Sequence, residues 1–205
     1  MKNGRVEIAV LVSGGGTNLQ ALIDAEKSGV IKSGEIVVVI SDREGVYALE
    51  RAKAAGIAAI TLSKKALGAE FESRLTAEID GAGAEIIVLA GFTSILSGEF
   101  TARYKDRIIN VHPSLIPSFC GKGFYGLKVH QAVLRYGVKV TGATVHFVNE
   151  IPDGGKIIMQ KAVEIKDGDD AETLQKRVMR EAEWKILPAA CEKVCAELIA
   201  DCGRR

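Results

Sequence analysis

The sequence has 205 residues, of which 47% are hydrophobic, 26% are charged and 5% are aromatic. Such a chain predicts one cytoplasmic domain over residues 1–205 with a substantial buried core. Lys and Arg number 27 against 26 Asp and Glu, and a net charge of +1 argues against nucleic acid or an anionic membrane as a partner. The apolar run 6–12 is too short for a signal peptide, and no later run would span a bilayer.

Short apolar runs alternate with helical patterns through the first half of the chain. The runs that predict strands are 7–12, 36–40, 57–62, 85–90 and 107–111. Between the third and fourth runs, Phe71, Leu75 and Ile79 recur at the spacing of one helix face. Alternating strands and helices predict an α/β fold, with a mostly parallel twisted sheet and helices on both of its faces.

The pattern changes after Tyr136. Residues 141–148 alternate between the two faces of a strand, and 157–165 is again typical of a strand. Between these runs, Pro-Asp-Gly-Gly at 152–155 is a turn signal. The two runs therefore predict an antiparallel hairpin, added to the parallel sheet near the C-terminal end.

A long helix is predicted at the C-terminal end. Asp-Asp-Ala-Glu at 169–172 places a capping carboxylate before it, and Pro188 is expected to kink or divide it. Within this helix, Cys191 and Cys195 lie one turn apart, a spacing that also suits two metal ligands. Because no histidine lies near them and no second pair follows, packing is the favoured interpretation.

Three consecutive glycines follow the first predicted strand, within Ser-Gly-Gly-Gly-Thr-Asn at 13–18. At the carboxyl edge of an α/β sheet, glycines let backbone N–H groups approach a ligand, and a helix start adds partial positive charge. A tight turn alone would also use glycine, but the adjacent polar residues favour anion binding. Thr17 and Gln20 are spaced as a capping box. Leu19 breaks the dinucleotide fingerprint and the Walker lysine is absent, so a terminal phosphate on a small substrate fits best.

The stretch 107–117 carries the clearest chemical signal and ends in Asn-Val-His-Pro-Ser-Leu-Ile-Pro. Asn110 and His112 are two residues apart at a strand end, so their side chains leave the same face. Pro113 and Pro117 stiffen the loop that follows. An amide beside an imidazole suits a reaction that develops an oxyanion, although a lone histidine at a strand end is usually structural.

The string Asn-Val-His-Pro-Ser-Leu-Ile-Pro resembles the signature of the folate-dependent formyltransferases. Four further stretches resemble the branch that formylates a phosphorylated ribosyl-glycinamide, namely 13–20, 89–96, 141–148 with Asp-Gly-Gly at 153–155, and 177–188. The resemblance implies a Rossmann-like sheet of about seven strands. It also implies transfer of a formyl group from 10-formyltetrahydrofolate to 5-phosphoribosylglycinamide in purine biosynthesis. Such an enzyme needs no metal, has small molecules as partners and acts as a monomer or homodimer.

The resemblance also implies the site residues. Asn110, His112 and Asp153 would form a catalytic trio, although Asp153 would otherwise be only a turn residue, and Asp153 would raise the proton affinity of the histidine. His146 would support the trio or be a buried structural residue, and His130 would pack or lie at the surface. The substrate would contact Gly16, Thr17 and Asn18 at its phosphate and Glu183 at its glycinamide end. The folate would contact Lys65, Thr93, Ser94, Ile95, Leu96 and Asn110.

Some positions depart from the usual pattern of this family. Thr93-Ser94 stands where Met-Arg is common, and the loop 118–126 is longer than in many members. An arginine that some relatives place at the folate has no match, and Lys64 and Lys65 fall nearby. A pterin that is bound by backbone groups of 91–96 would tolerate these side-chain changes.

Three alternatives use parts of the same pattern. A methionyl-tRNA formyltransferase shares the Asn-x-His-Pro-Ser signature but carries an additional C-terminal domain. A formyl-folate hydrolase normally has an N-terminal regulatory domain, whereas this sequence starts directly with the core. The glycine loop favours the ribonucleotide substrate over both. A non-catalytic phosphosugar-binding domain would need only that loop and would leave Asn110, His112 and Asp153 idle.

Overall fold

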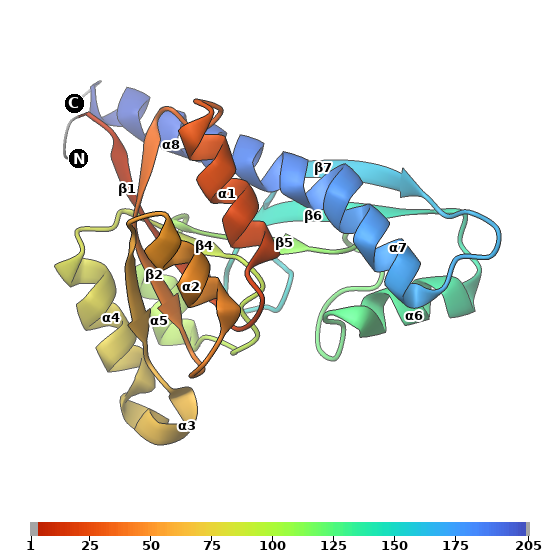
Figure 1. The fold of residues 1–205 in the computed structure, drawn as a ribbon, viewed down its shortest axis with the longest axis horizontal. Helices are drawn as coiled ribbons and strands as arrows, with labels where there is room; N and C mark the ends of the chain where they lie inside the picture. The colour runs from red at the N-terminus through yellow and green to blue at the C-terminus, as the bar shows by residue number, and fades with distance from the viewer. Residues whose placement is uncertain (1–3, 204–205) are drawn as a thin grey trace.

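Seven strands form one sheet in the order β3-β2-β1-β4-β5-β6-β7 in the computed structural model, which describes residues 4–203 (Figure 1). The strands β1 to β5 are parallel, while β6 is antiparallel to both β5 and β7. This arrangement confirms the predicted α/β sheet and its antiparallel addition. The strands are β1 (Val6–Val12), β2 (Gly34–Ser41), β3 (Ala58–Thr61), β4 (Ile86–Leu89), β5 (Ile108–His112), β6 (Val140–Phe147) and β7 (Ile157–Glu164).

Helices cover both faces of this sheet (Figure 1). Every residue of β1 is buried, and successive side chains enter two different apolar clusters. Ile8 and Val10 belong to the cluster that includes residues of α1, α2, α6, α7 and α8, whereas Ala9 and Leu11 belong to the one that includes residues of α4 and α5. The helices are α1 (Thr17–Lys27), α2 (Tyr47–Ala54), α3 (Lys64–Leu67), α4 (Phe71–Gly81), α5 (Gly98–Arg103), α6 (Leu127–Tyr136), α7 (Ala171–Val178) and α8 (Trp184–Cys202), with a 3₁₀ turn at Gly68–Glu70.

The start of α1 differs from the sequence prediction. Gly16 precedes the helix in the left-handed region, with φ 72°, and Thr17 is already its first helical residue. The side chain of Gln20 donates to Asp24 and accepts a hydrogen bond from Arg51. The predicted capping box of Thr17 and Gln20 is therefore wrong, because a cap residue must precede the helix and glycine takes that place here.

The C-terminal helix continues past Pro188. Asp170 caps α7 as predicted, since its side chain accepts a hydrogen bond from the Thr173 amide at 2.7 Å. A π-helical turn, Met179–Glu183, joins α7 to α8, and Pro188 lies inside α8. Pro188 does not divide α8, and the alternative that it kinks the helix stays a prediction.

Cys191 and Cys195 are buried in α8 as free thiols. Across residues 4–203, no group of three or more His, Cys, Asp and Glu side chains has an arrangement that could hold a metal ion. Over the same residues, none of the helices combines the length and apolar character that a bilayer crossing demands.

Candidate active site

The order of the strands reverses at β1, which has β2 on one side and β4 on the other. In open α/β sheets, ligands bind at such a switch point, beyond the carboxyl ends of the strands. The glycine loop follows β1, and the segment 90–96 follows β4. The Thr93 amide donates to Ser13 Oγ at 2.9 Å, so these two loops are joined directly. The loop expected to bind phosphate and the segment expected to bind folate are therefore neighbours.

Asn110, His112 and Asp153 converge at one end of β5. Asn110 and His112 lie on that strand, and the turn after β6 brings Asp153 beside them. Asp153 Oδ2 lies 3.4 Å from His112 Nδ1, and Asp153 Oδ1 lies 3.5 Å from His146 Nε2. The carboxylate therefore lies between two imidazoles, and only 13% of its side chain is exposed to solvent.

His146 is part of this cluster. It pairs with Asn110 across β5 and β6, and Asn110 Nδ2 lies 3.2 Å from His146 Nε2. His146 Nδ1 lies 2.8 Å from the Phe147 carbonyl oxygen, which accepts a hydrogen bond from that nitrogen. His146 Nε2 therefore lies between the Asn110 amide and the Asp153 carboxylate.

Burial and charge oppose each other in this cluster. Burial lowers the pKa of His112, and it outweighs the attraction of Asp153 and the hydrogen bond to the Phe119 carbonyl. Burial also disfavours the ionised form of Asp153, but His146, His112 and the Gly121 amide hold the pKa of Asp153 below its usual value. At neutral pH the pair is thus a carboxylate beside a neutral imidazole. Asp153 does favour the protonated histidine, as expected, but burial reverses the net effect on the pKa of His112.

The loop 118–126 closes over the same pair of side chains. His112 Nε2 donates to the Phe119 carbonyl at 2.9 Å, and the Gly121 amide donates to Asp153 Oδ2 at 2.8 Å. The Phe119 ring packs edge-on against Tyr136, with the ring centroids 5.8 Å apart. The loop therefore supplies two backbone partners to the trio. Sequence reasoning noted the length of this loop but missed both contacts, because backbone groups leave no mark in a sequence.

The glycine loop is linked to the C-terminal helix by a buried hydrogen bond. Asn18 Nδ2 donates to Glu183 Oε2 at 2.8 Å, and both side chains are buried. One N–H of this amide is thus bound to Glu183, and the backbone N–H of Asn18 lies in the first turn of α1. Burial raises the pKa of Glu183 to about 7, against the smaller opposing effect of the Asn18 hydrogen bond. Glu183 ends the π-helical turn, a feature that frequently marks functional sites.

Glu183→Gln is expected to stabilise the free protein at pH 8 and to change its stability little at pH 5. The carboxyl pKa is 4.5 without burial and about 7 in the folded state. The free energy of unfolding of the parent therefore falls as the pH rises between these two values, because Glu183 keeps its proton in the folded state and has lost it in the unfolded state. Above pH 7, ionisation of the buried Glu183 carboxyl lowers the free energy of unfolding by about 3 kcal/mol. The glutamine side chain is neutral and avoids this loss. Thermal melting at both pH values tests this, and an equal difference at the two values would contradict it.

The segment 90–96 is anchored to the end of β2. Arg43 Nη2 donates to Thr93 Oγ1 at 2.7 Å, and Ser94 Oγ donates to Asp42 Oδ2 at 2.6 Å. The Asp42 side chain is only 1% exposed, whereas Ile95 is 72% exposed. Polar side chains thus fix the segment from inside, and an apolar side chain is left at the surface. Sequence reasoning missed Asp42 and Arg43, although both follow β2 at the carboxyl edge of the sheet.

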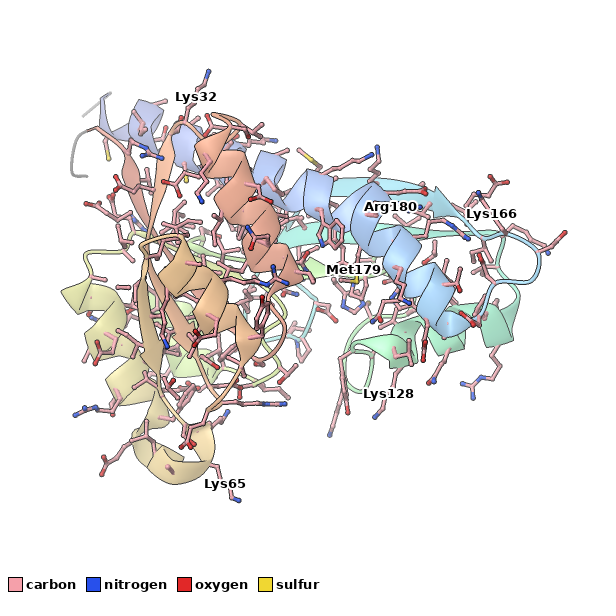
Figure 2. All side chains as sticks on the ribbon, viewed as in Figure 1. Lys32, Lys65, Lys128, Lys166, Met179 and Arg180 are labelled. Atoms are coloured by element: carbon pink, nitrogen blue, oxygen red, sulfur yellow. The ribbon has the colours of Figure 1, made fainter. Side chains whose placement is uncertain are left out.

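Lys64 contacts this segment, because its Nζ donates to the Ile95 carbonyl at 3.1 Å. Lys65 is the next residue of α3, and Figure 2 shows it projecting away from the sheet. Consecutive helical residues point about 100° apart, which separates the two lysines. Leu96 is half-buried against the cluster that contains α4 and α5. The role of Lys65 at the folate stays a prediction, and Lys64 is the lysine with a contact to the segment.

Ser94→Ala is expected to destabilise the protein by about 1–3 kcal/mol, because it removes a donor from the buried Asp42 carboxylate. The sequence alone predicts that Ser94→Ala changes the free energy of folate binding by well under about 1 kcal/mol. Because Ser94 holds the segment 90–96 through Asp42, we now expect a larger loss of folate affinity. Thr93→Val removes only a contact with the exposed Arg43 and is the matched control. Ile95→Pro should abolish folate binding, because proline restricts the chain. Melting and folate titration test these variants. Equal folate affinities for Ser94→Ala and its control would contradict the expectation that Ser94 holds the segment 90–96 in place.

His130 is buried in α6, and its ring nitrogens have no hydrogen-bond partner among the described residues. Burial lowers its pKa to about 4, with a smaller contribution from His112. His130 is therefore a neutral packing residue at neutral pH. Of the two places expected for it, the interior is the correct one.

The sequence pattern of the formyl transferase family matches residues 6–191. The chain belongs to this family. Formyl transferases of this family use formyl-folate as their co-substrate. The solved structure of glycinamide ribonucleotide transformylase 1 from Symbiobacterium toebii is similar to this formyl transferase with a TM-score of 0.88 and 38% identity. That match covers 96% of this chain and 90% of the other.

Two curated relatives of this formyl transferase differ in length. Phosphoribosylglycinamide formyltransferase from Escherichia coli is 40% identical over 185 residues, which is 89% of this chain and 84% of that protein. The trifunctional purine biosynthetic protein adenosine-3 from Gallus gallus is 44% identical over 198 residues, or 96% of this chain. The chain spans only 19% of that trifunctional relative.

Proposed function

We propose that this formyl transferase moves the formyl group of 10-formyltetrahydrofolate to the amine of 5-phosphoribosylglycinamide in de novo purine biosynthesis. The observation that carries the proposal is the contact between Ser13 and Thr93. It joins a phosphate-type glycine loop to the segment 90–96, at the edge of the sheet that also holds the trio. The name of the Escherichia coli relative supports the same substrate.

The reaction joins the amine nitrogen to the formyl carbon and breaks the bond between that carbon and the folate nitrogen. The neutral amine attacks, and the formyl oxygen becomes an oxyanion in the tetrahedral intermediate. Asn110 would donate a hydrogen bond to this oxygen. The amine must lose a proton and the folate nitrogen must gain one. Ionised Asp153 would accept the first, directly or through water, and would pass it to Nδ1 of the neutral His112, from which a proton would go to the folate nitrogen.

Protonation of His112 at Nδ1 would place the new positive charge against Asp153. That charge would also stabilise the oxyanion more strongly than a neutral donor does. Since the resting imidazole is neutral, it would gain this charge only during the reaction. The trio would then need no other charged group to balance its protons.

The two substrates would occupy neighbouring loops. Backbone N–H groups of Gly16, Thr17 and Asn18 would bind the substrate phosphate at the start of α1, and Glu183 would lie at the glycinamide end. Backbone groups of Thr93 to Leu96, with exposed Ile95, would form the pterin pocket. We propose that the chain acts as one domain in the cytoplasm, as a monomer or homodimer.

An absorbance assay of the purified protein tests the proposal and separates it from its alternatives. We expect the folate spectrum to change only when 10-formyltetrahydrofolate and 5-phosphoribosylglycinamide are both present. A change without the amine would indicate a formyl-folate hydrolase, and a requirement for methionyl-tRNA would indicate that formyltransferase. Binding of the phosphosugar without any spectral change would indicate a non-catalytic domain.

A further inference from the structure

The carbonyl groups of the glycine loop are bound by α2. The Gly14 carbonyl accepts a hydrogen bond from the Ala48 amide at 3.1 Å, in the first turn of that helix. The next carbonyl along the chain, that of Gly15, accepts one from Arg51 Nε at 2.9 Å. Two successive peptide groups of the loop therefore direct their oxygens toward the same helix.

This binding determines where the N–H groups of the loop point. The peptide bonds that follow Gly14 and Gly15 are trans, so each N–H is opposite its own carbonyl. The N–H groups of Gly15 and Gly16 are therefore directed away from α2, and neither meets an acceptor among residues 4–203. Gly16 has φ 72° and ψ 33°, the left-handed conformation found in backbone anion-binding nests.

The guanidinium of Arg51 is itself fixed in place. Its Nη1 donates to Gln20 Oε1 in α1 at 3.0 Å, and the group lies over the Tyr47 ring, 4.8 Å from the centroid. The planar guanidinium carries several N–H donors, so it can bind the loop and α1 at the same time. A lysine would keep the charge but not this arrangement of donors.

We propose that Arg51 is a positioning residue for the substrate phosphate. It holds the peptide between Gly15 and Gly16 so that the Gly16 N–H stays directed at the anion, and it acts through that peptide rather than by touching the substrate. This inference rests on the proposed function and deepens it.

Two substitutions at Arg51 test the inference, with Lys53→Met as the control. Lys53 is also on α2, but it is exposed and pairs with Glu50 on the same helix. We expect Arg51→Met and Arg51→Lys to raise KM for 5-phosphoribosylglycinamide about 5- to 10-fold, the loss expected from one hydrogen bond. Turnover, KM for folate and the affinity for the dephosphorylated substrate should stay within two-fold of the parent. Lys53→Met should change none of these values.

Other results would overturn the inference. A parent-like KM in Arg51→Lys would show that charge alone matters, and an equal loss of affinity for the dephosphorylated substrate would show a general structural role. A second measurement tests the inference even if the parent does not transfer formyl groups or Arg51→Met does not fold. Inorganic phosphate should shift the amide resonances of Gly15 and Gly16 in the parent, and this response should weaken in Arg51→Lys. An unchanged response would reject the positioning role, even if the parent shows no formyl transfer.

Discussion

Asp153→Asn is expected to lower turnover by about 10²–10⁴-fold and to leave the fold intact. The amide keeps the shape of the side chain but cannot accept the amine proton or attract a proton to His112. The turn should survive, because Asp153 has φ 57° and asparagine tolerates the left-handed region equally well. The Gly121 amide can still donate to the remaining side-chain oxygen.

Turnover in the folate assay and thermal melting test this expectation. Asp170→Asn is the matched control, because Asp170 caps α7 and asparagine caps helices as well as aspartate does. The control should keep the turnover of the parent. If Asp153→Asn also stays within a few-fold of the parent, Asp153 is only a turn residue and another group must take the amine proton.

Gly16→Ala is expected to weaken binding of the phosphorylated substrate by at least about 30-fold, the equivalent of about 2 kcal/mol. A Cβ atom at Gly16 would lie 2.7 Å from the Cβ and 2.8 Å from the Cα of Ala48. The left-handed backbone adds about 1–2 kcal/mol for any residue with a side chain, and overpacking adds about 1–3 kcal/mol. The loop must move to relieve this strain, so its N–H groups lose their direction.

Gly15→Ala is the control, because a Cβ atom there meets nothing within 4 Å and the backbone φ is not positive. The sequence alone predicted that valine at either Gly15 or Gly16 would block the phosphate, and the structure separates the two positions. Isothermal titration with substrate and with folate tests the difference. Equal losses for both ligands in Gly16→Ala would indicate general disruption, and equal substrate affinities for the two variants would contradict the expected clash.

Much of the fold could be predicted because buried strands and one-sided helices leave periodic patterns. The continuous apolar run of β1 and the repeat of Phe71, Leu75 and Ile79 in α4 are confirmed. The predictions that were wrong concern local sequence patterns that are compatible with two different backbone structures. Thr17 and Gln20 fit a capping box, but the left-handed Gly16 precedes a helix that already includes Thr17. The π turn Met179–Glu183 has no simple sequence signal, and Pro188 lies inside α8 without dividing it.

The candidate site was partly predictable for a similar reason. The two-residue period of a strand placed Asn110 and His112 on one face, and their proximity follows from β5 alone. The place of Asp153 came only from the family resemblance, because a turn signal does not say which side chain its carboxylate meets. Contacts between distant segments, such as Arg51 with Gly15, depend on the packing of α2 against the loop, which no local pattern encodes.

The loop 118–126 has an electrostatic consequence for the charge states of His112 and Asp153. The Phe119 carbonyl raises the pKa of His112, and the Gly121 amide lowers the pKa of Asp153. Both contacts therefore favour charge separation, with the proton on the imidazole and off the carboxylate. Opening the loop would remove both contacts together and shift the pair toward its uncharged form. The backbone of one surface loop thus favours the charged form of both side chains, without contributing a charge of its own.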